Sequence, residues 1–217
     1  ALPICRVHAY GGKVIATVVT EKHALAAERA GVDALIVTGH EAAAHGGDVT
    51  SLVLIPAVCQ ITRLPLIATG GFGTGGGLLA ALALGADAVA MGTRFAMSQE
   101  SPVHARTKHE ITRKAVSDTL YTVNFDSMGC RIMKTPEAEK VAAKPLSLPR
   151  VMVMALQAAR ETGQPLLSLV HAVLRQGFLP ALKLAYFGAA TLKIRKATVD
   201  GDLANGVQLI GQVQGLI

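Results

Sequence analysis

Short apolar runs alternate with longer mixed segments through the first hundred residues of the chain. The apolar runs are rich in valine, isoleucine and alanine, and they predict buried strands over residues 14–19, 34–37, 66–69 and 88–91. The segments between them predict helices over residues 20–30, 52–61 and 77–84. The first helix has Thr20 as its expected N-cap and Gly31 as its stop. The order βαβαβαβ predicts an α/β fold with a parallel sheet and right-handed crossovers.

This alternation ends at about Ser101-Pro102. Residues 104–119 predict an amphipathic helix, and residues 121–130 predict a short strand or loop. Further helices are predicted over residues 151–160, 165–175 and 180–184. We therefore expect residues 1–101 to form one domain and residues 102–200 to form a mainly helical substrate or lid domain over the open end of the sheet.

The composition indicates a globular protein without a membrane segment. Of the 217 residues, 51% are hydrophobic and 17% charged, which is typical of a folded chain. Charged residues or glycines interrupt each apolar run before it can span a membrane, and the first residues lack the pattern of a signal peptide. Cys5, Cys59 and Cys130 are far apart and without metal-ligand spacing. We expect a cytoplasmic protein with reduced thiols and no metal site.

The net charge of +6 does not indicate nucleic-acid binding. Acidic residues lie among the basic residues of two of the three basic segments. Aromatic residues make up only 4% of the chain and tryptophan is absent, so side chains on which bases stack are scarce. Solvated helix faces explain the charge, and no nucleic-acid partner is expected.

Three successive predicted strands end in glycine, at Gly39, Gly70 and Gly92. The carboxyl ends of parallel strands are where α/β folds place their active sites, and glycine lets backbone N–H groups approach an anion closely. Two adjacent strand ends of this kind favour one phosphate shared by both, as in the late strands of a (β/α)₈ barrel. A match to G-x-G-x-x-G at Gly71 is a weak indication of a dinucleotide site, because the next strand ends without the expected acid.

The loop after the second strand, GHEAAAHGG over residues 39–47, carries the candidate acid–base group. Small neighbours leave room around His45 for a planar ligand, and a neutral imidazole exchanges a proton near neutral pH. A loop histidine that caps a helix end is an equally good interpretation of His45. His40 is the rival candidate or a wall residue. Glu41 either accepts backbone N–H groups to hold the loop or is solvated.

Several segments together closely resemble the nitronate monooxygenase family, formerly called 2-nitropropane dioxygenase. They are AGVDA at 30–34, the loop at 39–47, ATGGF at 68–72, residues 80–88, MGTRF at 91–95 and the tail GQVQGLI at 211–217. The resemblance covers about residues 14–100 and the tail. It implies an FMN-binding (β/α)₈ TIM barrel with a helical substrate domain. This chain would supply the C-terminal half of the barrel from residues 1–101, and residues 201–217 a tail that returns to it.

The resemblance also implies roles for individual residues. His45 matches the active-site histidine. Gly70, Gly71, Gly92 and Thr93 match the backbone groups that hold the FMN phosphate, Glu41 matches the acid of the same loop, and Gln212 lies in a tail near the flavin. Ala44 replaces a usual glycine, which we expect to be a mild change.

The implied activity is oxidative denitrification of alkyl nitronates with O₂. The alternative within the family is an NAD(P)H-dependent FMN reductase acting on an enoyl-ACP or other acyl thioester, or on a quinone. An alternative of another class is a non-catalytic fragment or subunit that completes a barrel with a partner. Because only half a barrel is recognisable, we expect the missing half from the same or another chain, and a homodimer is a further expectation.

Overall fold

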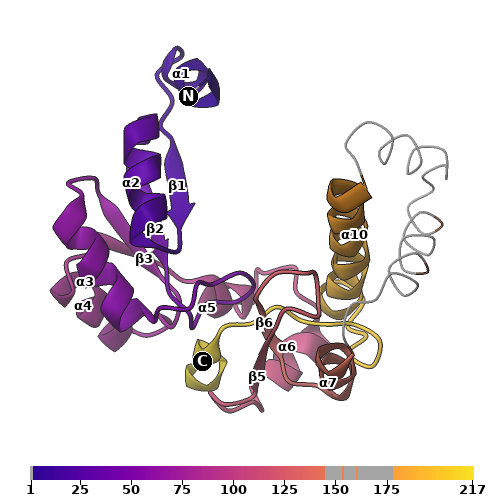
Figure 1. Cartoon of the computed structure of the whole chain (residues 1–217). Coiled ribbons are helices and arrows are strands. Elements are labelled where there is room, and N and C mark those ends of the chain that lie inside the picture. Colours follow the sequence, from indigo (N-terminus) through magenta and orange to yellow (C-terminus); the bar gives the residue numbers. More distant parts are fainter. Residues whose placement is uncertain (1, 145–152, 154–159, 161–177) are drawn as a thin grey trace. The chain divides into compact units, whose positions relative to one another are not determined.

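The computed structural model describes residues 2–144, 153, 160 and 178–217 (Figure 1). The chain divides into two compact units. Unit 1 contains Ala1–Ser101, Ile111–Asp118 and Ile210–Ile217, and unit 2 contains Pro102–Glu110 and Thr119–Leu209. Residues 201–209, which the sequence grouped with the tail, therefore lie in unit 2.

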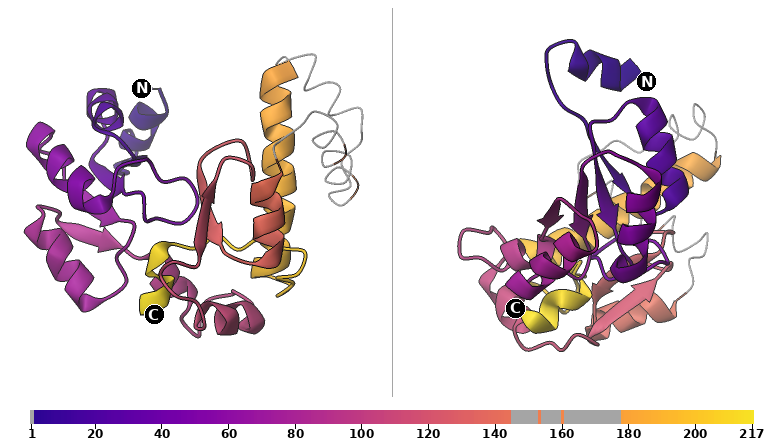
Figure 2. Two further views of the ribbon diagram at one scale, coloured as in Figure 1. Left: turned by 60° about the horizontal axis from the view of Figure 1, so that its bottom comes forward. Right: turned by 90° about the vertical axis from the view of Figure 1, so that its left-hand side faces the viewer.

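Unit 1 is built on a parallel sheet. Its strands are hydrogen-bonded in their order along the chain: β1 (Ile15–Val18), β2 (Ala34–Thr38), β3 (Leu66–Thr69) and β4 (Ala88–Ala90). The connecting helices are α2 (Glu21–Ala30), α3 (Ser51–Ile61) and α4 (Gly75–Ala83), grouped with the strands in both views of Figure 2. The predicted βαβαβαβ order and the parallel sheet are confirmed. Sequential strand order with right-handed crossovers puts all the helices on one face.

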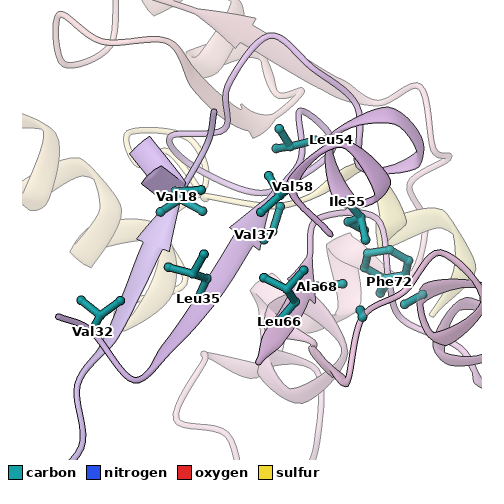
Figure 3. Packing of buried hydrophobic residues seen from close by; sticks show 13 residues of the cluster. Val18, Val32, Leu35, Val37, Leu54, Ile55, Val58, Leu66, Ala68 and Phe72 are labelled. Carbon is teal, nitrogen blue, oxygen red and sulfur yellow. The ribbon is translucent and has the colours of Figure 1, made fainter. Parts of the chain in front are cut away.

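The helix-facing side of this sheet carries the core of unit 1. Val18, Leu35, Val37, Leu66 and Ala68 alternate along the strands and are at most 3% exposed. They pack with Leu54, Ile55 and Val58 of α3 (Figure 3). The alternate strand residues face the other way, and among these Ile15 is 51% exposed. The helix-facing side of the sheet is therefore fully buried, and the opposite, apolar side is only partly buried.

The ends of α2 are as the sequence predicts. The Thr20 side chain accepts a hydrogen bond of 3.1 Å from the backbone N–H of His23. Gly31 follows the helix with a φ of +90°, in the left-handed region that glycine adopts without strain. Three short helical elements of unit 1 were not predicted, namely α1 (Leu2–His8), α5 (Gly92–Ala96) and the 3₁₀ helix η1 (Gln212–Leu216).

Asp33 joins α1 to the amino ends of β1 and β2. Its carboxylate accepts hydrogen bonds from the Val14 N–H at 2.8 Å, from the His8 ring at 2.8 Å and from Lys13 Nζ at 2.9 Å. The Val14 N–H is the largest cause that holds the pKa of Asp33 well below its usual range, followed by His8 and Lys13. A carboxyl whose pKa is lowered by folding stabilises the native state above its unfolded pKa of about 4 and loses that stabilisation as the pH falls.

We expect the change Asp33→Asn to lower the free energy of unfolding at pH 7 and to lower it less at pH 3, where part of the stabilisation by the carboxylate is already lost. Urea unfolding of the wild type and the variant at the two pH values measures this difference. Other carboxyls titrate equally in both proteins, so the comparison isolates Asp33. An equal deficit at both pH values would contradict the role given to the carboxylate.

Unit 2 contains both helices and a small antiparallel sheet. Helices α6 (Ala105–Ile111), α7 (Pro136–Ala143) and α10 (Phe178–Thr198) accompany a hairpin of β5 (Thr119–Thr122) and β6 (Cys130–Met133). The returning chain extends the hairpin, because Ile132 bridges to Leu209 and the Met133 N–H donates to the Gln208 carbonyl at 2.8 Å. The half-buried Lys193 of α10 forms an ion pair with Glu137 of α7. The predicted role of this unit as a lid stays a prediction.

Two predictions for this half of the chain need correction, and one further helix was not predicted. The helix predicted over residues 104–119 ends at Ile111, because the chain turns where the Ala115 N–H donates to the Asp118 carboxylate. The polar residues 138–144 were not predicted to be helical, yet α7 covers most of them. The helix predicted over residues 180–184 is part of the much longer α10. The helices predicted over residues 151–160 and 165–175 lie outside the described residues, apart from Val153 and Arg160.

In the part of the chain that the structure describes, none of the helices has the length and apolar character needed to cross a membrane.

Candidate cofactor site at the carboxyl ends of β2 to β4

The last residues of three strands of unit 1 form one row across the sheet. Thr38 of β2 pairs with Thr69 of β3, and Thr69 pairs with Ala90 of β4. A cavity of about 210 Å³ opens beside this row. It is lined by the strand ends, by the loops that follow them, and by Gly211 and Val213 of the C-terminal segment. The structure therefore brings Gly70, Gly71, Gly92 and Thr93 together around a single cavity, as the sequence predicts.

The turn after β3 requires glycine twice. Gly70 and Gly71 have φ values of +96° and +81°, a region that side chains other than glycine rarely adopt. A Cβ atom on Gly70 would lie 2.9 Å from the carbonyl oxygen of Gly39, so the loop after β2 approaches the turn at backbone distance. A Cβ on Gly71 would lie 3.3 Å from the Cβ of Glu41. These two loops are therefore packed together, and neither position leaves room for a side chain.

Gly92 serves a different purpose. It begins helix α5, and the preceding residue, Met91, makes no side-chain capping hydrogen bond. A Cβ atom added to Gly92 would meet nothing within 4 Å, so the glycine leaves open space at the edge of the cavity. The first N–H groups of a helix have no partner within the helix. The position therefore leaves room for a bulky group in the cavity beside the start of a helix.

Thr93 connects the site to the C-terminal segment. It is only 7% exposed, and its Oγ1 accepts a hydrogen bond of 3.3 Å from the Gly211 N–H. Arg94 makes the same connection from the next position, since its guanidinium donates to the carbonyls of Gly73 at 2.7 Å and Leu216 at 3.0 Å. The sequence analysis gave no role to Arg94.

Glu41 holds the loop after β2, which is the first of the two interpretations that the sequence left open; its predicted role in cofactor binding stays a prediction. Its two carboxylate oxygens share the N–H of Ser51, at the start of α3, in one bifurcated hydrogen bond with distances of 2.9 and 3.1 Å. The hydroxyl of Ser51 lies 3.0 Å from the same carboxylate and 2.7 Å from the Gly70 carbonyl, and its single proton serves one of them at a time. The Glu41 carbonyl accepts a 3.0 Å bond from the Gln212 N–H. Ser51, which the sequence analysis missed, thus links three segments around the cavity.

Replacing Glu41 with alanine should lower the free energy of unfolding by about 2 kcal/mol, because hydrogen bonds to a charged group contribute about 1.5–3 kcal/mol each. Urea unfolding measures the change. Glu21→Ala is the matched control, since Glu21 lies in the first turn of α2 and such a charge contributes only about 0.3–1 kcal/mol through the helix dipole. Equal losses in the two variants would refute the structural role of Glu41.

His40 closes the loop on itself. Its Nδ1–H donates to the Gly47 carbonyl at 2.7 Å, and its backbone N–H donates to the Val49 carbonyl at 2.9 Å. These bonds support the earlier interpretation of His40 as a wall residue. Ala44 has a φ of +56°, and an alanine in the left-handed region carries about 1–2 kcal/mol of strain. A glycine, which the resemblance implies at this position, would adopt the same φ without strain, so Ala44 is a less mild change than expected from the sequence.

Three of the predicted site residues lie outside this cavity. Among the described residues, the lining does not include His45, Glu41 or Gln212. His45 is half-buried in the same loop as Glu41, and its active-site role stays a prediction. Gln212 contributes its backbone N–H to the loop rather than a described side-chain contact with the cavity.

The cavity also has a lining residue that the sequence did not single out. Thr38 is 7% exposed, and its buried hydroxyl has no hydrogen-bond partner among the described residues. Its only signal in the sequence is a polar residue at the end of an apolar strand, directly before Gly39.

Comparisons with known proteins identify a family and several similar proteins. The model of a family described as nitronate monooxygenase matches residues 2–217. A (3aS,4S,5R,7aS)-5-hydroxy-7a-methyl-1-oxo-octahydro-1H-indene-4-carboxyl-CoA dehydrogenase from Rhodococcus jostii is 42% identical over 132 residues, which cover 61% of this chain and 37% of that protein. The dehydrogenase of the same name from Mycobacterium tuberculosis is 32% identical over 224 residues, covering 99% of this chain and 62% of that protein.

A solved structure shows the same fold over nearly the whole chain. FabK from Thermotoga maritima is 33% identical with a TM-score of 0.74, and the match covers 99% of this chain and 58% of that chain. This chain therefore spans less than two thirds of the length of each of these three proteins.

Proposed function

The chain belongs to the nitronate monooxygenase family, and from this membership we propose that it is part of an FMN-dependent oxidoreductase. The cavity at the carboxyl ends of β2 to β4 is the site of the FMN phosphate. The observation that carries the proposal is the pair of strand ends, Gly70-Gly71 and Gly92-Thr93, that line this cavity together. This arrangement is typical of phosphate sites in βα-repeat folds.

The residues present suit such a group. The space beside Gly92 can hold part of a ligand, and any side chain at this position would fill it. The buried hydroxyl of Thr38 has no hydrogen-bond partner in the described part of the chain, which is costly unless a bound molecule supplies one. The bonds of Glu41 and Ser51 hold the loops in place before the cofactor arrives, and such preorganisation reduces the entropy lost on binding.

In this proposal each residue has a defined task. Backbone N–H groups of Gly71, Gly92 and Thr93 donate to the phosphate oxygens, and the Gly211–Thr93 bond keeps the start of α5 in position. His45 holds or delivers a proton at a ring nitrogen and so orients the substrate. When bound, the flavin ring supplies the transfer of electrons or hydride.

Oxidation of alkyl nitronates with O₂ is the first candidate activity, in line with the description of the family. Dehydrogenation or reduction of a CoA thioester is the second. It is favoured by the two relatives from R. jostii and M. tuberculosis, whose names describe a CoA-thioester dehydrogenase. The FMN site is common to both activities and does not separate them.

Anaerobic flavin reduction separates these candidates. A nitronate such as propionate 3-nitronate should bleach the flavin and be turned over when O₂ is admitted if the first candidate holds. Two results would support the second candidate. NAD(P)H bleaches the flavin, and an unsaturated CoA thioester or a quinone then reoxidises it, or a saturated CoA thioester bleaches the flavin directly. A flavin that none of these compounds reduces or reoxidises would contradict both, and a protein without flavin would support the non-catalytic alternative.

The proposal includes further βα units. The apolar face with Ile36 and Ile67, and the half-exposed Ile15, would be buried if the sheet continued into a closed (β/α)₈ barrel. Those units come from the same polypeptide or from a second one. The native mass of the active protein measures this. A monomeric, active species of 22.5 kDa would contradict it.

A further inference from the structure

Arg94 joins three segments of unit 1. It lies in α5, two residues after the helix begins at Gly92. Its Nε donates to the carbonyl of Gly73, in the turn after β3, at 2.7 Å, and its Nη2 donates to the carbonyl of Leu216, in η1, at 3.0 Å. One half-buried side chain therefore connects the start of α5 with the turn after β3 and with the C-terminal segment.

The two acceptors are carbonyls at the borders of helices. Leu216 is the last residue of η1, and the last carbonyls of a helix have no partner within it. Gly73 directly precedes Thr74, the N-cap of α4. A guanidinium presents its N–H groups in a rigid, planar fork, and its charge makes its hydrogen bonds stronger than those of neutral donors. The Arg94 side chain is therefore suited to hold two carbonyls at a fixed separation.

The segments that Arg94 connects carry the proposed phosphate donors. Gly71 lies two residues before Gly73, so their Cα atoms are at most about 7 Å apart, and Thr93 directly precedes Arg94. Both Gly71 and Thr93 line the cavity, whereas Arg94 is not among the lining residues. It therefore acts on the cavity through its neighbours.

The sheet itself does not fix the separation of these two segments. The last residues paired between β3 and β4 are Thr69 and Ala90. The chain continues beyond this pair to Gly71 on one side and to Thr93 on the other, where the hydrogen bonds of the strands no longer join the two segments. The Nε bond of Arg94 to Gly73 restores a connection between them.

We propose that Arg94 is a positioning residue, whose guanidinium holds the turn after β3 and the start of α5 at the separation at which one phosphate binds both. This inference rests on the proposed FMN site, and it gives Arg94 a task that needs no contact with the cofactor. Segments that are already in place lose less entropy when the ligand binds.

Two substitutions of Arg94 separate its shape from its charge. Arg94→Lys keeps the positive charge, but an ammonium group lacks the planar fork. Arg94→Gln removes the charge as well. Fluorescence titration should show that each variant binds FMN about tenfold to hundredfold more weakly, the factor that corresponds to the loss of one hydrogen bond from a charged group. Because Arg94 is only half-buried, we expect both variants to fold.

The ³¹P NMR resonance of bound FMN distinguishes a positioning role from a general loss of stability. At saturating FMN, a changed separation of the two segments alters the hydrogen bonds to the phosphate, so the resonance should shift in both Arg94 variants. Asp33→Asn is the control, since it removes a carboxylate at the amino ends of the strands. It should lower the melting temperature of the flavin-free protein and leave both the FMN affinity and the resonance unchanged.

Each other result would overturn the positioning role. Wild-type affinity in Arg94→Lys with a loss only in Arg94→Gln would mean that the charge alone matters. Weaker binding with an unshifted resonance, a lower melting temperature with unchanged FMN binding, or an equal shift in Asp33→Asn would also contradict it. A wild-type protein that does not bind FMN would instead refute the proposed function, so the two failures are distinguishable.

Discussion

Replacing Gly92 with valine should lower the affinity for FMN about a hundredfold or more and leave the free energy of unfolding nearly unchanged. A Cβ on Gly92 meets no atom of the described residues within 4 Å, so we expect the fold to accept a side chain there. The added atoms fill the space next to the first N–H groups of α5. Loss of two charge-assisted hydrogen bonds, at about 1.5–3 kcal/mol each, corresponds to at least this factor.

Gly75→Val is the matched control for Gly92→Val. Gly75 also begins a helix, and a Cβ there also meets nothing within 4 Å, but Gly75 is not one of the cavity's lining residues. Equilibrium dialysis or fluorescence titration with FMN measures affinity, and urea unfolding measures stability. If both variants keep the wild-type affinity, the phosphate is not held at the start of α5.

Replacing His45 with alanine should slow substrate-dependent flavin reduction or reoxidation by about 10²–10⁴-fold, the usual contribution of general acid–base assistance. FMN affinity should barely change, because His45 is not among the described lining residues of the phosphate cavity. Stopped-flow absorbance of the flavin measures the rate per bound cofactor.

His40→Ala is the comparison for His45→Ala, since both histidines lie in one loop and His40 already has a structural task. Losing its 2.7 Å bond to the Gly47 carbonyl should cost about 1 kcal/mol of stability and little of the rate. If His45→Ala keeps the normal rate and loses only stability, His45 is a loop residue and not a catalytic residue.

The sequence predicted unit 1 well because its signals are local. Apolar strands, the Thr20 cap and the stop at Gly31 each depend on a few neighbouring residues, and the structure has them where the pattern put them. The glycines at 70 and 71 were predictable for the same reason, since a strand that ends in Gly-Gly marks a turn with positive φ.

Unit 2 was harder to predict because its helices depart from the simple patterns. Helix α7 has start signals in the sequence, a cap at Thr135 and Pro136 in the first turn. The residues that follow are mostly polar, so the spacing of apolar residues that indicates a helix is not evident. Helix α10 extends far beyond the predicted residues 180–184, with Pro180 in its first turn and Gly188 in its interior. A proline in the first turn removes an N–H that has no helical partner anyway, so the helix tolerates it.

Two features of the site exist only in three dimensions. That Glu41 would hold the loop was predictable, but its partner Ser51 follows from the meeting of two segments ten residues apart. The sequence also cannot show that the Thr38 hydroxyl lacks a partner among the described residues. Thr69 is also the last residue of its strand, yet its hydroxyl has a partner, the Ala90 carbonyl. Hydrogen-bond satisfaction depends on which atoms the fold brings together.

The flavin content of the native protein tests the central claim most directly. The absorbance spectrum of the purified protein, followed by denaturation and mass analysis of the released cofactor, gives the amount and identity of any bound flavin. We expect one FMN per chain in the wild type and in Gly75→Val, and almost none in Gly92→Val. A native protein that carries no flavin and takes up none from added FMN would contradict the claim, as would a Gly92→Val protein with full FMN content.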